Sequence, residues 1–151
     1  MKAGQPGNSL LVRAACARIL PAVNVVQEAA YWTTTKDSAG QTLRGQHEYV
    51  LQFPVGQLPP NDAFWSLTMT DVVGYMVSNP IDRSSLGSRS GLVPNADGSL
   101  DIYLQRAAPA GHESNWLPAP AGYFKLMLRA YLPGRAILDG EYHVPPVMKV
   151  Q

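Results

Sequence analysis

Two runs of alternating apolar and polar residues dominate the second half of the chain. The first covers residues 100–105 and the second residues 123–132. Alternation with a period of two is the signature of a strand that buries one face. The sequence therefore predicts a sheet with one core face and one wet face. The side chains expected to face the core are Leu100, Ile102 and Leu104 in the first run, and Phe124, Leu126, Leu128, Ala130 and Leu132 in the second.

Further strand patterns lie on both sides of these runs. Residues 31–35, 48–53, 64–71 and 147–150 are rich in β-branched or aromatic residues, or alternate in the same way. The last of these follows two prolines, which is typical of an edge strand. Asp97-Gly98 predicts a hairpin turn, because this pair supplies the positive backbone angles that such a turn requires. We therefore expect an all-β domain.

Three connections interrupt the strands. Residues 107–122 contain too many prolines and glycines for a helix or a central strand, so they predict a long loop. In residues 79–87, Asp82 is suited to cap a short helical piece that Gly87 would end. Residues 133–140 predict another short helical turn, again closed by a glycine.

The N-terminus has a different pattern. Asn8 or Ser9 can cap a helix that runs to about Leu20, where Pro21 would end it. We therefore divide the chain into a helix and lead-in at residues 1–30 and a β-domain at residues 31–151. The helix either packs on the β-domain or offers its apolar face to another subunit. That apolar face consists of Leu11, Val12, Ala15, Cys16 and Ile19.

Composition narrows the classes of function. A chain of 151 residues can bury a sufficient core without a disulfide or a metal. The formal charge is +1 and no basic run occurs, which argues against a nucleic-acid partner. A single cysteine, Cys16, excludes an intrachain disulfide. No stretch reaches the length of a membrane span, and Met1 to Asn8 do not resemble a signal peptide. The sequence predicts a soluble protein, cytoplasmic as written and periplasmic if a signal was removed.

Four ordered segments carry a family resemblance that covers roughly residues 31–150. Together they resemble the bacterial domain-of-unknown-function family twelve-fourteen. The segments are Phe64-Trp65-Ser66-Leu67-Thr68-Met69, Val77-Ser78-Asn79-Pro80-Ile81-Asp82-Arg83, Asn95-Ala96-Asp97-Gly98-Ser99-Leu100 and Ser114-Asn115-Trp116-Leu117-Pro118-Ala119-Pro120.

The resemblance implies a jelly-roll-like antiparallel β-sandwich, usually placed C-terminal to a second uncharacterised module, twelve-fifty-four. Here the sandwich stands as a separate chain, so a function that needs both modules is an open question. The family has no established reaction, and the resemblance therefore supplies no catalytic residue.

Intact chemical motifs are scarce in this sequence. It lacks a phosphate-binding glycine loop, a paired-histidine zinc motif and a cysteine pair, so we expect no metal and no cofactor. His112 and Asp82 are the candidates for acid or base in a metal-independent hydrolase. Their site would be formed by the 79–85 and 111–116 loops. The structural alternative gives Asp82 only a capping role.

Candidate ligand-binding residues fall into two groups. Asn79 and Arg83 could form a pocket for an anion or carboxylate, because arginine offers a fork of donors, or they could only bond to backbone. The outward side chains of the two alternating runs could form a binding face of aromatic rings and donors, or a simple solvated face. Trp116 would either fold over that face or plug the end of the sandwich. The outward residues are Tyr103, Gln105, Met127, Arg129 and Tyr131.

Three functions remain open from the sequence. The first is a non-catalytic binding or assembly module for a small molecule or a protein partner, favoured by the lack of an intact catalytic motif. The second is the hydrolase with His112 and Asp82. The third is a homo-oligomeric structural unit that associates through the N-terminal helix or a sheet edge.

Overall fold

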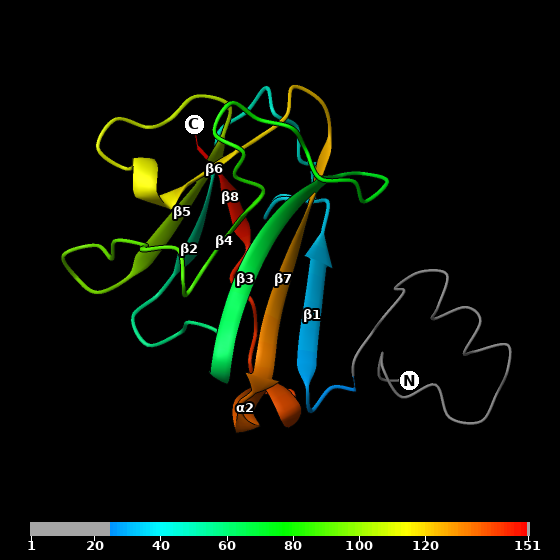
Figure 1. Ribbon diagram of the computed structural model, residues 1–151, viewed down its shortest axis with the longest axis vertical. Helices are drawn as coiled ribbons and strands as arrows, with labels where there is room; N and C mark the ends of the chain where they lie inside the picture. Colours follow the sequence, from blue (N-terminus) through cyan, green and yellow to red (C-terminus); the bar gives the residue numbers. More distant parts are fainter. Residues whose placement is uncertain (1–24, 151) are drawn as a thin grey trace, which may run out of the picture.

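Two four-stranded sheets pack face to face in the computed structural model, which describes residues 25–150 (Figure 1). A single turn of 3₁₀-helix, η1, and one short helix, α2, lie between strands. The elements in chain order are β1 (Ala29–Thr34), β2 (Tyr49–Phe53), β3 (Asn61–Asp71), β4 (Ser85–Gly87), β5 (Leu100–Gln105), η1 (Glu113–Asn115), β6 (Trp116–Pro118), β7 (Phe124–Pro133), α2 (Arg135–Leu138) and β8 (Val147–Lys149).

The strand order is β1-β7-β3-β4 in one sheet and β6-β5-β2-β8 in the other. All paired neighbours are antiparallel except β5 and β6, which run parallel. The core lies between the sheets and contains the apolar rows of both long runs. Tyr49 and Phe124 meet there edge to face, with ring centroids 5.9 Å apart. The all-β sandwich expected from the alternating pattern is therefore confirmed.

One member of the predicted core row is wrong. Leu132 is 50% exposed and has a φ of 49°, in the left-handed region that a leucine rarely adopts. A register shift in β3 between Asn61 and Phe64 accompanies this change in β7. Pro133, rather than Leu132, is consequently buried at the end of β7.

The two loop predictions also need correction. The predicted helical piece at 79–87 is absent, because Asp82 has a left-handed φ of 50° and Ser85–Gly87 form strand β4 beside β3. The long loop at 107–122 contains η1 and the edge strand β6. Three residues of strand next to prolines are compatible with an edge position, where few ladder hydrogen bonds are needed.

Several smaller predictions have clear outcomes. The helical turn after β7 is confirmed as α2, followed by Gly140 with a φ of 79°. The 95–98 turn is present, but it leads from β4 to β5 in the opposite sheet and so does not join a hairpin. The predicted N-terminal helix lies outside the described residues. None of the helices in residues 25–150 is long and apolar enough to span a membrane.

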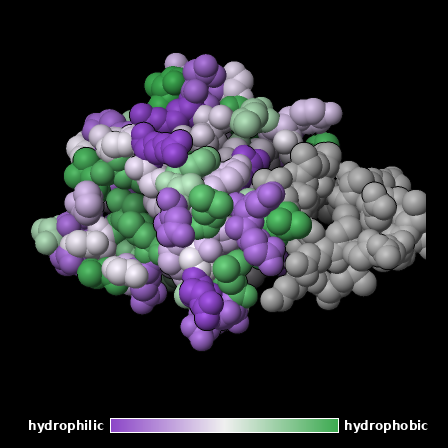
Figure 2. All heavy atoms as spheres, turned by 60° about the horizontal axis from the view of Figure 1, so that its bottom comes forward, coloured by the Kyte–Doolittle hydropathy of each residue, from purple (hydrophilic) through white to green (hydrophobic). Residues whose placement is uncertain are grey.

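The surface at the α2 end is mixed in character. Apolar side chains lie there in several groups separated by polar ones (Figure 2).

Candidate functional site

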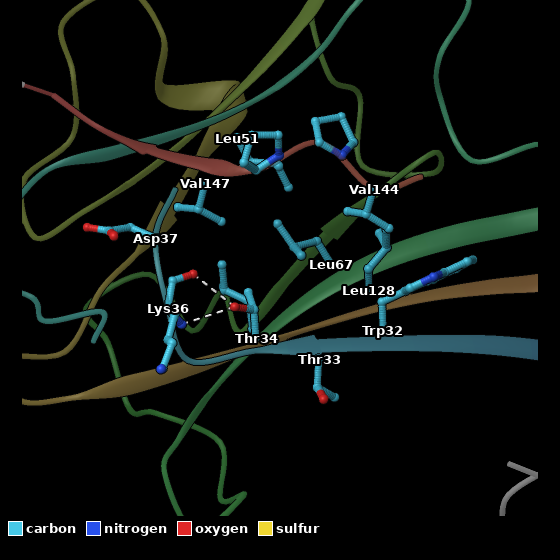
Figure 3. A pocket seen from close by; sticks show the side chains of 13 residues that line it. Trp32, Thr33, Thr34, Lys36, Asp37, Leu51, Leu67, Leu128, Val144 and Val147 are labelled. Carbon is cyan, nitrogen blue, oxygen red and sulfur yellow. Dashed lines mark hydrogen bonds between the residues drawn. The ribbon is translucent and has the colours of Figure 1, made fainter. Parts of the chain in front are cut away.

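A cavity of about 330 Å³ lies between the two sheets, on the side where β1 and β8 are the edge strands. Its lining is mostly aliphatic, and the inner faces of both sheets contribute to it. Figure 3 shows these side chains converging on the empty space. The principal apolar lining residues are Trp32, Leu51, Leu67, Leu126, Leu128, Val144 and Val147.

The outer wall of the cavity is the segment before β8, residues 142–146, which does not pair with a neighbouring strand. β8 pairs with β2 over only three residues, and Pro145-Pro146 precede it. Proline has no backbone N–H for a ladder, so the segment before β8 crosses the gap without forming a strand. Val144 and Pro145 line the cavity and are only partly buried. A short strand and a proline pair thus leave room between the sheets.

An aromatic contact lies beside this wall. Trp32 on β1 meets Tyr142 edge to face, with ring centroids 5.7 Å apart. The Tyr142 hydroxyl donates a hydrogen bond to the Gln57 carbonyl at 3.3 Å. Burial raises the pKa of Tyr142 to about 12, because the charged phenolate would lose its hydration. The wall is therefore fastened to both β1 and the β2–β3 connection.

Polar groups at the cavity mouth are mostly engaged with backbone. The Thr34 hydroxyl donates to the Lys36 carbonyl at 2.8 Å and accepts from the Lys36 N–H at 3.0 Å. The Asp37 carboxylate accepts from the backbone N–H groups of Ala39 and Gln41, at 3.0 and 2.9 Å. In Figure 3 that carboxylate and the Lys36 amine point away from the apolar side chains.

The interior of the cavity offers mainly apolar contacts. The lining offers a large apolar surface and places no paired acid and base toward the empty space. Within residues 25–150, no group of three or more histidine, cysteine, aspartate or glutamate side chains is placed to hold a metal ion.

A second region contains most of the polar residues that the sequence suggested. Arg83 reaches from the β3–β4 connection to the segment between β5 and β7. Its guanidinium donates to the carbonyl of Glu113 at 2.7 Å and to the carbonyl of Trp116 at 2.9 Å. We call this contact the arginine clamp. The 79–85 and 111–116 loops therefore do meet, through donors to carbonyl oxygens.

Asn79 prepares Arg83 for this contact. Its side-chain oxygen accepts from the Arg83 N–H at 2.9 Å, and its amide group donates to the Arg83 carbonyl at 2.9 Å. Asp82, between them, is exposed and adopts the left-handed conformation that aspartate tolerates better than most residues. Both polar ends of the Asn79 side chain are thus occupied by backbone.

The third candidate group lies on the outer face of the β6-β5-β2-β8 sheet. Tyr103 contacts His112, with ring centroids 4.8 Å apart, and pairs in register with Trp116. Trp116 is 8% exposed and donates its indole N–H to the Gln105 carbonyl at 2.8 Å. The Gln105 side chain donates to the Ala107 carbonyl at 2.9 Å. Burial, followed by the charge of Asp101, raises the pKa of Tyr103.

The predicted common face is wrong in one respect. Tyr103 and Gln105 belong to β5, whereas Arg129 belongs to β7 in the other sheet. Arg129 donates from Nε to the sulfur of Met127 at 3.2 Å. Because these residues lie on different sheets, they do not form one continuous surface. The prediction failed because alternation within two strands does not reveal whether the strands share a sheet.

Comparison with known proteins gives the chain a family. A sequence profile described as "Protein of unknown function (DUF1214)" matches residues 28–135. The chain belongs to the DUF1214 family. This confirms the resemblance inferred from the four ordered segments. No curated protein matches the chain.

Two solved structures resemble this DUF1214 domain. The VPA0106 protein from Vibrio parahaemolyticus is 30% identical with a TM-score of 0.79, and the match covers 93% of this chain and 35% of that one. An uncharacterised protein from Burkholderia cenocepacia is 18% identical with a TM-score of 0.51, covering 95% of this chain and 44% of that one, and this likeness shows the fold alone. The chain thus spans less than half the length of either protein.

Polar residues of the DUF1214 segments stabilise loops of the domain. Asn79, Arg83, Asn115 and Trp116 come from two of the four ordered segments, and each donates a side-chain hydrogen bond to a backbone carbonyl. Sequence reasoning missed the cavity residues as a site, because Leu51, Leu67 and Leu128 read simply as core. The only local signal was Pro145-Pro146, which marks a place where strand pairing stops.

Proposed function

We propose that this DUF1214 domain is a non-catalytic binding module that takes a small apolar molecule into the cavity between its sheets. The cavity of about 330 Å³ and its aliphatic lining carry the proposal. This volume is about twice that of an apolar cavity of roughly 150 Å³ that stays dry and binds benzene. Apolar cavities bind apolar ligands in preference to water, since water finds no polar partners there. We also propose that the strands of this sandwich are connected as in a jelly roll.

The aliphatic lining also favours a ligand that buries hydrocarbon over one that buries a charge. Burying a charge among aliphatic side chains would cost far more than burying a hydrocarbon. The Lys36 amine at the mouth could meet an anionic end group outside the apolar space. Medium-chain alcohols and carboxylic acids therefore make a suitable first series of probes.

The test is a titration with decanol and decanoate, followed by methyl NMR. We expect chemical-shift changes at the methyl groups of Leu51, Leu67 and Leu128, which line the cavity, and little change at Leu104. Val144→Phe places a ring in the wall and should lower affinity for both probes at least tenfold. Val93→Phe is the matched control, because Val93 is 59% exposed and does not line the cavity.

Two results would contradict the proposal. Shifts that are absent from the cavity methyl groups at saturating probe would exclude this cavity as the site. The second result is hydrolytic turnover by the purified protein. Turnover that is lost in His112→Ala or Asp82→Ala would show that the domain is an enzyme and not a non-catalytic module.

A further inference from the structure

Five residues between β3 and β4 form an exposed apolar tip. Val72, Val73, Tyr75 and Met76 are 53%, 74%, 73% and 64% exposed, and Gly74 lies between them. We call residues 72–76 the apolar tip. It projects from the upper end of β3 in Figure 1. Single exposed apolar residues are ordinary, but four large ones within five positions indicate a contact surface.

Hydrogen bonds hold this tip in one conformation. One carboxylate oxygen of Asp71 accepts from the N–H groups of Val73, Gly74 and Tyr75, at 2.9, 2.7 and 2.9 Å. The backbone N–H of Asp71 also donates to the Tyr75 carbonyl at 2.9 Å. These bonds, above all that from Tyr75, lower the pKa of Asp71. The apolar side chains are therefore presented to solvent by an ordered turn, which lowers the entropy cost of a later contact.

Cationic and aromatic groups lie at the base of the tip. Lys125 pairs in register with Thr70, and its amine lies 3.6 Å from where a Cβ on Gly74 would be. Tyr123, the residue before β7, is 48% exposed, and the Arg44 guanidinium lies 4.6 Å from its ring centroid. Neither Lys125 nor Arg44 has a carboxylate within salt-bridge distance among the described residues.

We propose that the apolar tip inserts into the interface of an anionic lipid bilayer, with Lys125 and Arg44 at the phosphate level. All four large side chains of the tip are more than half exposed, and a fluid bilayer can accommodate them together. Tyrosine is suited to this depth, because its ring is apolar and its hydroxyl remains hydrated. Lysine and arginine next to such a segment are attracted by anionic headgroups. This surface is distinct from the cavity, which opens at the β1 and β8 edges.

The experiment is co-sedimentation of the protein with sucrose-loaded vesicles. We expect binding to equimolar phosphatidylglycerol and phosphatidylcholine, and weaker binding to phosphatidylcholine alone. Val73→Asp with Met76→Asp should lower the affinity for the mixed vesicles at least tenfold. The matched control is Val55→Asp with Leu58→Asp, which changes two residues that are 62% and 43% exposed at the opposite end of β3. The control should bind like the unmodified protein.

Two further variants separate charge from order. Lys125→Gln should weaken binding to the mixed vesicles severalfold and leave binding to phosphatidylcholine nearly unchanged. Asp71→Ala keeps the apolar side chains but removes the three carboxylate hydrogen bonds, so it should also bind severalfold more weakly. Circular dichroism and methyl NMR would verify that each variant retains the sandwich.

The proposal fails if the unmodified protein does not bind the mixed vesicles at millimolar lipid. It also fails if the tip variant binds as well as the unmodified protein. A tip variant that instead changes the mass in solution, measured by light scattering, would assign the tip to a contact between copies of the chain and overturn the lipid proposal.

Discussion

The arginine clamp and the cavity use opposite kinds of residue. At the clamp, Arg83 and Asn79 direct their polar groups to backbone of their own chain. At the cavity, aliphatic side chains that look like ordinary core border a space of about 330 Å³. Residues with catalytic or binding chemistry thus stabilise the loops here, and residues without it form the candidate site. The type of residue alone does not identify a site, because it matters whether its atoms already have partners.

Two leucine truncations give the strongest test that the cavity is packed less tightly than the rest of the core. Leu104 and Leu128 are both almost fully buried, at 0% and 2% exposure, but only Leu128 borders the cavity. We expect Leu104→Ala to lower the free energy of unfolding by about 4 kcal/mol and Leu128→Ala by about 2 kcal/mol, because a side chain beside a void loses fewer contacts. Urea denaturation measures both. Equal losses would mean that the region is as well packed as the rest of the core.

Asn115 tests whether polar residues near the clamp support the fold. It is 3% exposed, accepts from the Val93 N–H at 2.8 Å and donates to the carbonyls of Val93 and Asp101, at 2.7 and 2.9 Å. Asn115→Ala leaves these backbone groups without a partner and should cost about 3 kcal/mol of unfolding free energy. Ser114→Ala, at the exposed neighbouring position, is the control. An unchanged unfolding midpoint in Asn115→Ala would be incompatible with this role.

Arg83→Met tests the clamp itself. The variant retains much of the apolar stem and loses the two hydrogen bonds to Glu113 and Trp116. Its unfolding free energy should fall by about 2 kcal/mol, since hydrogen bonds from a charged group are stronger than neutral ones. Arg106→Met, at an exposed position, should change it little. Affinity for decanol should be the same in Arg83→Met and the unmodified protein, and a large loss of affinity would connect the two regions.

Tyr142 gives the smallest effect and concerns only the cavity wall. Its pKa is raised from 10.0 in the unfolded chain to about 12 in the folded one, so the neutral phenol is favoured by folding. This contribution to stability is complete below pH 10 and is lost as the pH rises from about 10 to about 12. We expect a tyrosinate step near pH 12 in an alkaline absorbance titration. That step should be missing in Tyr142→Phe, and its persistence would assign it to another tyrosine.

Local pattern predicted the strands well and the connections poorly. The row from Leu100 to Leu104 followed alternation, since a strand between a core and solvent has no other way to bury its apolar side chains. Residues 79–87 did not form a helix, because the Asn79 side chain bonds to Arg83 and directs the chain toward the clamp. Strand β6 was missed because it has three residues, one of them Pro118. Its parallel pairing with β5 depends on the path of the loop between them, which has no hydrophobic periodicity.

The candidate site was still less accessible from sequence. The four ordered segments identified the family, yet their polar residues Asn79, Arg83 and Asn115 bond to backbone of the same chain. The cavity depends on the distance between two sheet edges and on how far β8 pairs with β2. Both are properties of tertiary structure. Only the proline pair before β8 marks the place in the sequence.

The strand order also determines when the domain can fold during synthesis. β1 pairs with β7, and β2 lies between β5 and β8, so each sheet joins an early strand to a late one. The ribosome must release β7 before the first sheet is complete and β8 before the second is complete. Loop closure over such separations slows folding. Until β7 emerges, β1 has no strand partner within the chain, and other chains could capture its free edge. A nascent chain that stalls before β7 should therefore aggregate or require a chaperone, whereas the finished domain should not.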